Sequence, residues 1–273
     1  MRALVKLPEV AQRFFEPADW RNDPYSLLDP VRETDAKVFA LHRETGEKIR
    51  RTIKGGPKKE YMQARGLGAY EVAFNLKKGA LSNIIDLYRN KTGLAAVSVI
   101  DAGCGEGRAT EQMFVLDAVD ENESIGITIH EPNSSRSKIA EVNIAEIKPK
   151  KEGGNMKRFD LFTCSYGALT YHPMNRIVND CNDFAFALLQ AINFVKDGGL
   201  IFSKSFSYMN ISSSDFISMG ILELAPEHNQ FTYFNYNPAC VLRVVRRPSP
   251  REILKLLRVE DSKEYSMFGS ADL

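Results

Sequence analysis

Apolar residues follow two different rhythms along this chain. Short, β-branched apolar runs predict buried strands, whereas apolar residues spaced three and four apart predict helices that pack on a core. Strands are predicted at residues 95–101, 124–132, 159–165 and 200–206, and in a closing antiparallel hairpin at residues 231–236 and 241–246. Helices are predicted at residues 31–51, 61–92, 108–116, 133–142, 177–195 and 212–224, with a last helix that begins at Ser249-Pro250. Strands separated by helices predict an α/β fold.

Two stretches lack a strand pattern. Residues 144–156 are mostly charged or turn-forming, so the third strand of the expected sheet has no clear place. Residues 1–60 contain scattered prolines and one long helical stretch, and we expect a helical N-terminal extension or cap there. Residues 61–262 are expected to form the core domain, and residues 263–273 a flexible tail.

The first predicted strand ends in a glycine-rich turn. The string Asp101-Ala102-Gly103-Cys104-Gly105-Glu106-Gly107 places an aspartate after an apolar run and glycine at every second position thereafter. Glycine tolerates positive φ and puts no Cβ in the path of a ligand. Open α/β sheets bind ligands at the carboxyl ends of their strands, so the turn predicts a nucleotide-like ligand. Its spacing differs from the G-x-G-x-x-G pattern of dinucleotide sites.

This string resembles motif I of the class I S-adenosylmethionine (SAM)-dependent methyltransferases. The resemblance implies a mostly parallel seven-stranded sheet with helices on both faces, and SAM as the cofactor. An acidic loop suits SAM, which carries an ammonium and a sulfonium group and no phosphate. The implied cofactor contacts are Asp101, Gly103, Cys104, Gly105, Thr128, His130, Asn133, Ser165 and Tyr166.

The second predicted strand departs from the commonest pattern of that family. Thr128 stands where many members carry an acidic residue that binds the ribose hydroxyls. The string Gly-Ile-Thr-Ile resembles a variant found in cyclopropane-fatty-acid-synthase-like and sterol methyltransferases, in which threonine and a following polar side chain make the ribose contact. Thr128, His130 and Asn133 are then the ribose candidates. This resemblance slightly favours a small-molecule or lipid acceptor.

Lys204 points to a different acceptor, because it interrupts an otherwise apolar strand, where an unpaired charge is costly. Residues 198–206 resemble the matching strand of RNA 2′-O-ribose methyltransferases, in which such a lysine belongs to a Lys-Asp-Lys-Glu tetrad that deprotonates the ribose hydroxyl. Lys204 is therefore a candidate catalytic base. The other tetrad positions do not match and fall on or near Ser165, Ala239, Glu71, Lys77 and Lys78.

Further residues are candidates for acceptor binding or catalysis. His172 follows the fourth predicted strand and is a candidate general base, and Tyr171 beside it is a candidate substrate contact. Residues 45–65 carry seven basic and two acidic side chains, a net charge of +5. Such a patch suits RNA, although many charge runs are only solvated surface. Arg50, Arg51 and Lys54 are its candidate contacts.

Composition sets broader limits. The chain has 273 residues and a net charge of +1, which gives no global field toward nucleic acid or membrane. No apolar run reaches the roughly 18 residues of a membrane span, and the N-terminus lacks the apolar core of a signal peptide. We therefore expect a cytoplasmic protein. The four cysteines are far apart in sequence and indicate neither a disulfide framework nor a metal site.

The sequence leaves three functions open. The first is a SAM-dependent methyltransferase for a small molecule or lipid, and the second is an RNA or cap 2′-O-ribose methyltransferase. The third is a SAM-fold binding or regulatory protein that does not catalyse, because most of the acidic partners are missing. The acceptor atom and the oligomeric state do not follow from the sequence.

Overall fold

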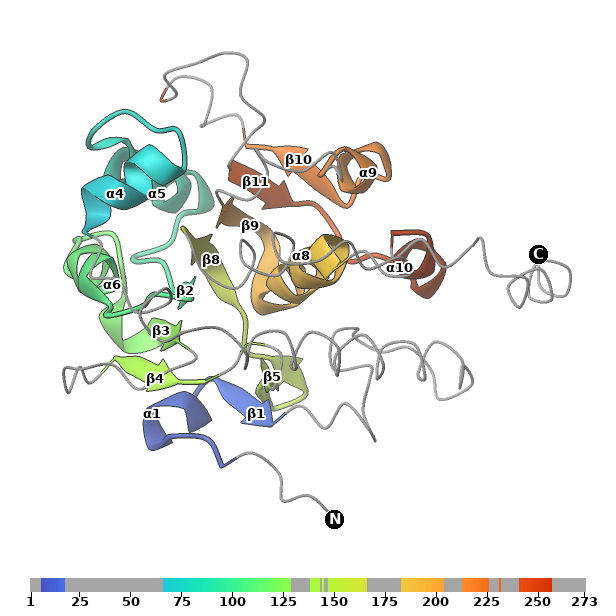
Figure 1. Ribbon diagram of the computed structural model, residues 1–273, viewed down its shortest axis with the longest axis horizontal. Helices are drawn as coiled ribbons and strands as arrows, with labels where there is room; N and C mark the ends of the chain where they lie inside the picture. Colours follow the sequence, from blue (N-terminus) through green and yellow to red (C-terminus); the bar gives the residue numbers. More distant parts are fainter. Residues whose placement is uncertain are drawn as a thin grey trace, which may run out of the picture.

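A computed structural model shows how these elements are arranged (Figure 1). The structure describes residues 6–17, 66–128, 138–142, 144, 147–165, 183–203, 213–225, 231 and 241–256.

Within these ranges, seven strands form the central sheet in the order β10-β11-β9-β8-β2-β3-β4. The strands are β2 (Val99–Ala102), β3 (Ile125–Thr128), β4 (Ile139–Glu141), β8 (Phe159–Cys164), β9 (Val195–Ser203), β10 (Leu222–Leu224) and β11 (Val241–Val244). All run parallel except β11, which is antiparallel to both of its neighbours. The predicted fold class is therefore confirmed: this is the mostly parallel, seven-stranded sheet of the class I methyltransferase fold.

Helices cover both faces of the sheet (Figure 1). One face carries α4 (Leu67–Ala73), α5 (Ala80–Thr92) and α6 (Arg108–Phe114), and the other carries α8 (Asp183–Phe194), α9 (Ser213–Ser218) and α10 (Pro250–Leu256). Successive side chains of a strand point to opposite faces. In β2, Val99 accordingly packs with the α4–α6 layer and Ile100 with the α8–α10 layer. Both faces of the central strands are thus buried, as parallel sheets require.

The last helix begins at the predicted residues. The Ser249 N–H donates to Glu252 Oε2 at 2.7 Å, and the Glu252 N–H donates to Ser249 Oγ at 3.4 Å. This reciprocal pair is a capping box, with Pro250 at the first helical position. A hydrogen bond from Arg246 lowers the pKa of Glu252 to about 2. The cap is therefore charged and complete at neutral pH.

Two strands lie where helices are predicted. Residues 139–141 form β4, the third parallel strand, so the helix predicted at residues 133–142 is wrong over these residues. The helix predicted at residues 212–224 ends at Ser218, and Leu222–Leu224 then forms β10. β10 pairs with β11, whereas residues 232–236, where the predicted hairpin partner falls, lie outside the described residues. Pairing with a neighbouring strand outweighs local propensity in both cases.

Two junctions between elements also differ from the prediction. The single helix predicted over residues 61–92 is divided into α4 and α5. Asn75 and Gly79 between them have φ of 56° and 77°, which a continuing helix excludes. Residues 196–199, which separate the helix predicted at 177–195 from the strand predicted at 200–206, lie inside β9, which begins immediately after α8 ends at Phe194.

The N-terminal residues belong to the core at the amino ends of the strands. Helix α1 (Glu9–Gln12) leads into β1 (Phe15–Pro17), which pairs antiparallel with β5 (Ile147–Pro149) in a small separate sheet. The Phe14 and Phe15 rings lie 5.5 and 6.1 Å from the ring of Phe159, where β8 begins. The long helix predicted at residues 31–51 lies outside the described residues, and the domain limits remain a prediction.

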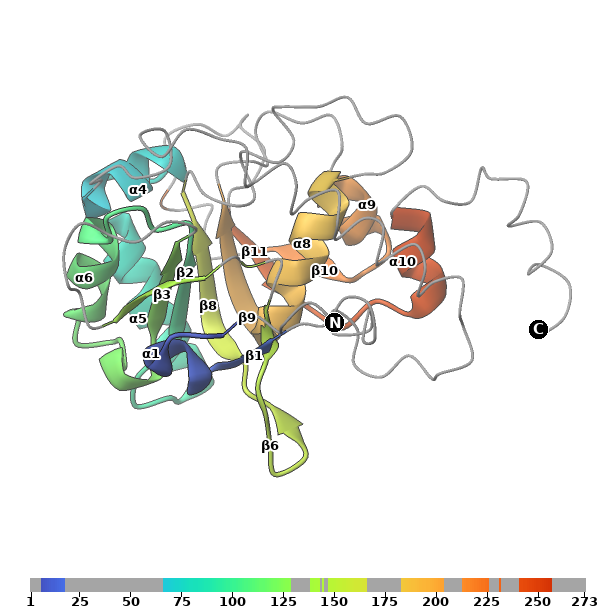
Figure 2. The ribbon, with the colours of Figure 1, turned by 60° about the horizontal axis from the view of Figure 1, so that its bottom comes forward.

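The remaining elements are short. A 3₁₀ turn, η2 (Glu121–Glu123), leads into β3, with the Asp120 side chain accepting from the Asn122 and Glu123 N–H groups. β6 (Lys151–Glu152) and β7 (Asn155–Met156) form a hairpin turned by Gly153 and Gly154. Figure 2 shows β6 projecting away from the body of the molecule. None of the helices within the described ranges has both the length and the apolar character that a membrane crossing requires.

Candidate functional site

The glycine loop connects β2 to α6. Gly103, Gly105 and Gly107 have φ of 75°, 59° and 75°, in the left-handed region that favours glycine. The N–H groups of Gly103 and Cys104 donate to the carbonyl of Ile127 at 2.8 and 3.1 Å. These bonds fasten the loop to the neighbouring strand β3. The loop therefore has a fixed shape, with no Cβ at three of its positions.

The loop lies where the order of strands reverses. β2 pairs with β3 on one side and with β8 on the other. The chain passes from β2 through β3 to the edge strand β4, and then returns to β8 on the opposite side of β2. Such a switch point leaves a crevice at the carboxyl ends of the two diverging strands, where ligands bind in open α/β sheets. By this rule, the expected ligand crevice here lies between the ends of β2 and β8.

Beneath the loop, the Asp101 carboxylate is the centre of a buried hydrogen-bond network. Asp101 is 0% exposed. Its Oδ2 accepts from the Tyr70 hydroxyl at 2.9 Å and from the Thr110 hydroxyl at 2.5 Å, and its Oδ1 accepts from the Thr163 hydroxyl at 2.9 Å. The donors come from α4, α6 and β8. One carboxylate thus holds two helices and a strand against the base of the loop.

This network holds a negative charge that no basic side chain pairs with in the described part of the chain. Burial raises the pKa of Asp101 to about 6, although the hydrogen bonds from Thr110, Tyr70 and Thr163 lower it. Burial, followed by the neighbouring Asp101 charge, raises the pKa of Tyr70 well above its usual value. Among the described residues, no basic side chain forms an ion pair with Asp101. At neutral pH the base of the loop therefore carries a buried, uncompensated negative charge.

Ser165 supplies an unsatisfied polar group at the carboxyl end of β8. It follows β8 directly and is 2% exposed. Its Oγ has no hydrogen-bond partner in the part of the chain that the structure describes. Buried hydroxyls are nearly always hydrogen-bonded in native proteins, so this oxygen is suited to meet a bound ligand. Together with the Cβ-free loop, it fits a cofactor in this crevice.

Gly126 allows the loop and α6 to pack closely on β3. A Cβ at Gly126 would lie 2.9 Å from Thr110 Cγ2 and 3.1 Å from Cys104 Sγ. Two residues further on, Thr128 ends β3 and is 2% exposed. In register with it, the exposed Glu141 ends β4. Sequence reasoning missed Glu141 because the third strand could not be placed.

Asn75 is a second unsatisfied group that the sequence did not indicate. It follows α4 with φ of 56°, and its side-chain Nδ2 is buried without a partner among the described residues. The preceding Phe74 ring lies 5.7 Å from the ring of Phe202, near the carboxyl end of β9. The end of α4 is thus held over the carboxyl end of the sheet. Positive φ at a non-glycine residue has no sequence signal.

The tetrad of the RNA 2′-O-ribose methyltransferases is not assembled from the described residues. Ser165 stands at the end of β8, where that family has an aspartate. Glu71, near the expected first lysine, accepts from the N–H groups of Gly79 and Leu81 at 3.0 and 3.1 Å. It therefore caps the start of α5, which is a structural role.

Nine of the candidate residues lie outside the described part of the chain, and their roles remain predictions. They are His130, Asn133, Tyr166, Tyr171, His172, Lys204, Arg50, Arg51 and Lys54.

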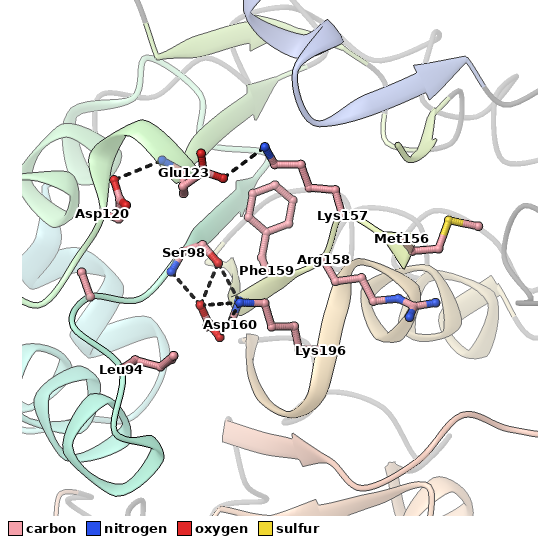
Figure 3. Close-up of a pocket in the computed structure, with 11 residues that line it drawn as sticks. Leu94, Ser98, Asp120, Glu123, Met156, Lys157, Arg158, Phe159, Asp160 and Lys196 are labelled. Carbon is pink, nitrogen blue, oxygen red and sulfur yellow. Dashed lines mark hydrogen bonds and ion pairs between the residues drawn. The ribbon is translucent and has the colours of Figure 1, made fainter. Parts of the chain in front are cut away.

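A separate pocket of about 340 Å³ lies at the amino ends of the strands (Figure 3). Inside it, Asp160 is 3% exposed and accepts from the Ser98 hydroxyl at 2.8 Å and from Lys196 Nζ at 3.0 Å. This carboxylate is already paired, unlike Asp101. Asp160 is the second residue of β8 and Ser165 follows the other end of this strand, so the pocket is separate from the glycine loop.

Comparison with known proteins gives remote structural likenesses. No protein-family model and no curated protein matches the chain. Among solved structures, it is similar to 1,6-didemethyltoxoflavin-N1-methyltransferase of Burkholderia thailandensis with bound 1,6-didemethyltoxoflavin and S-adenosylhomocysteine. That similarity has 13% identity, covers 73% of this chain and 72% of the other, and has a TM-score of 0.31.

Two further solved structures are similar over a smaller part. DesVI of Streptomyces venezuelae is 16% identical, with 51% of this chain and 52% of the other covered and a TM-score of 0.33. The sugar N-methyltransferase KedS8 of Streptoalloteichus sp. ATCC 53650 is 14% identical, with 46% and 47% covered and a TM-score of 0.31. The chain matches about half the length of these two proteins. The fold itself is defined by the strand order and the helices on both faces of the sheet.

Proposed function

We propose that this chain is a SAM-dependent methyltransferase that acts on a small-molecule acceptor. The observation that carries the proposal is the position of the Asp101–Gly107 loop at the switch point, with three glycines at positive φ. Ser165, which directly follows β8 at this switch point, has an unsatisfied hydroxyl among the described residues. The loop glycines, Thr128 and Ser165 are the residues that would hold SAM, which supplies an electrophilic methyl group when it is bound.

The charge of the site supports SAM over a phosphate-bearing cofactor. The group buried beneath the loop is a carboxylate, held by neutral hydroxyls. A negative charge at this place repels a pyrophosphate and attracts a sulfonium or an ammonium group. The spacing of the glycines agrees with this preference, because it departs from the dinucleotide pattern.

The acceptor side of the proposal rests on the chain's own residues. The Gly-Ile-Thr-Ile end of the second strand resembles methyltransferases of small molecules and lipids. Ser165 stands where the RNA tetrad has an aspartate, and Glu71, near its expected first lysine, caps α5 instead, so these two described residues give no support to RNA chemistry. Helix α4 lies beside the loop, because Tyr70 ties it to Asp101 and Phe74 packs on Phe202. Positioning of the reactants supplies most of the rate of methyl transfer.

Cofactor binding is tested by calorimetry with SAM. The wild-type protein is expected to bind SAM saturably, and Gly105→Ala to weaken binding about tenfold, because a Cβ at φ of 59° strains the loop. Gly154→Ala is the matched control, since Gly154 also has positive φ but lies in the β6–β7 turn. Absence of saturable binding by the wild-type protein at millimolar SAM would refute the cofactor proposal.

The acceptor class is tested by labelling with tritiated SAM. RNA, protein and small-molecule fractions of a lysate are incubated with the protein, and label is expected in the small-molecule fraction. Label in RNA would instead establish the RNA alternative. SAM binding without label in any fraction would favour a binding or regulatory protein.

A further inference from the structure

The hydrogen-bond network around Asp101 does not require a charged side chain at this position. Tyr70, Thr110 and Thr163 contribute hydroxyls, and a hydroxyl can accept a hydrogen bond as well as donate one. A neutral side chain at position 101 could therefore join the same three elements. A buried carboxylate without a cation is costly, so the charge itself needs an explanation.

Among the described residues, the groups that contact Asp101 do not compensate its charge. Its titratable hydrogen-bond partner is Tyr70 from α4, and Tyr70 in turn lies near Cys104 from the loop and Cys164 from β8. α6 contributes Thr110, which is neutral, and β8 also contributes Thr163. No positive side chain is present among these described neighbours. The field of the carboxylate is therefore directed, through little screening solvent, at whatever occupies the loop above it.

We propose that the buried Asp101 charge makes the site select the positively charged cofactor over its neutral product. This inference rests on the proposed function. SAM and S-adenosylhomocysteine differ by one methyl group, and with it by the positive charge of the sulfonium. Their ribose, adenine, ammonium and carboxylate groups are the same. A negative charge beneath the loop attracts the sulfonium form and has no such attraction for the thioether, which favours release of the product.

The ratio of two dissociation constants isolates this effect. We would measure Kd for SAM and for S-adenosylhomocysteine by calorimetry at pH 8. In Asp101→Asn, the preference for SAM over S-adenosylhomocysteine is expected to fall about tenfold relative to wild type. Loosening of the loop would weaken both ligands equally and would leave the ratio unchanged. Asp160→Asn is the matched control, because Asp160 is a buried strand aspartate at the opposite end of the sheet.

Dependence on pH gives a second readout that a structural role would not produce. The preference of the wild-type protein for SAM is expected to increase between pH 5 and pH 8, as Asp101 ionises with a pKa of about 6. In Asp101→Asn the ratio should be flat over this range. The ammonium and carboxylate groups of the two ligands titrate alike, so their effect cancels in the ratio.

Other outcomes are decisive as well. Equal weakening of both ligands by Asp101→Asn, or a flat ratio in the wild-type protein, would overturn the inference. If Asp101→Asn does not fold, Thr163→Val keeps the charge and removes one donor that lowers the pKa of Asp101. The midpoint of the ratio should then move to higher pH, and an unmoved midpoint would overturn the inference. Failure of the wild-type protein to bind either ligand would instead refute the proposed function.

Discussion

At the scale of single residues, the buried charge of Asp101 lowers the stability of the fold while it supports the proposed cofactor binding. Its pKa is about 6 in the folded protein and 3.8 in the absence of structure. The folded state therefore binds a proton more tightly than the unfolded state. Below pH 4 the Asp101 carboxyl is neutral, and its burial then does not oppose folding. As pH rises through about 6 the buried carboxyl ionises in the folded protein, and this part of the stability is lost. Near neutral pH the charge beneath the loop destabilises the protein.

Asp101→Asn is accordingly expected to raise the free energy of unfolding at pH 8. Each pKa unit is worth about 1.4 kcal/mol, so removal of the buried charge should contribute on the order of 3 kcal/mol. The gain should vanish at pH 4, where the wild-type carboxyl is neutral. Urea unfolding at both pH values measures the difference. Asp160→Asn should lose stability at pH 8, because Asp160 is paired with Lys196. A variant of Asp101 equally stabilised at both pH values would contradict this account.

The residues of the site differ in how far the sequence indicates them. The glycine loop could be predicted because its conformation depends on a short local string. The Asp101 network could not, since Tyr70 and Thr163 are far from Asp101 in the sequence and meet it only through the fold. The unsatisfied atoms of Ser165 and Asn75 could not be predicted either, because whether a polar atom finds a partner depends on which residues the fold brings next to it.

At the scale of elements, the close packing of α6 on β3 decides the shape of the loop. Gly126 makes it possible, because Thr110 and Cys104 occupy the space that a side chain at position 126 would need. These two residues also belong to the α6–loop unit that surrounds Asp101. Packing of this strand and the geometry of the loop are therefore coupled.

Gly126→Ala is expected to lower the free energy of unfolding by about 1–3 kcal/mol, because α6 and the loop must move to admit the Cβ. SAM affinity should fall with it, as measured by calorimetry. Gly68→Ala is a matched control on α4, where an added Cβ meets nothing within 4 Å. That variant should instead gain up to about 1 kcal/mol, because alanine favours the helix. Equal behaviour of the two variants would show that the packing at Gly126 is not critical.

The strands that sequence reasoning misplaced are the two edges of the sheet. β2, β8 and β9 are central, and their apolar runs overlap the predicted strands at 95–101, 159–165 and 200–206. β4 and β10 are three residues long and have one pairing neighbour each within the described sheet. Strands this short carry too few residues for a period-2 pattern, and their position is fixed by the strand beside them.

At the scale of the whole molecule, residues 6–17 are part of the core. Phe15 is 2% exposed and packs its ring edge-on against Phe194 at the end of α8, with centroids 5.5 Å apart. The order of strands and helices along the sequence was sufficient to predict the α/β class. The place of this segment was not predictable, because its partners lie more than a hundred residues away in sequence.

Phe15→Ala is therefore expected to lower the free energy of unfolding by about 3–5 kcal/mol, the usual cost of emptying a phenylalanine site in a core. Urea unfolding measures it. SAM affinity at a temperature where the variant is folded should change little, because Phe15 lies at the amino ends of the strands. Val115→Ala, at a side chain 75% exposed, should stay within about 0.5 kcal/mol of wild type. A similarly small effect for Phe15→Ala would show that the segment is dispensable.

The contact of Phe15 with Phe194 has a consequence for synthesis of the protein on the ribosome. Chains grow at roughly 5–20 residues per second, so Phe194 is made about 10–40 seconds after Phe15. For most of that interval, until residues 147–159 have been made, the nascent chain carries two unburied phenylalanines and an unpaired strand. Phe15 thus completes its contacts only when α8 has emerged. We expect the domain to complete its folding late in translation, after most of the chain has already left the ribosome.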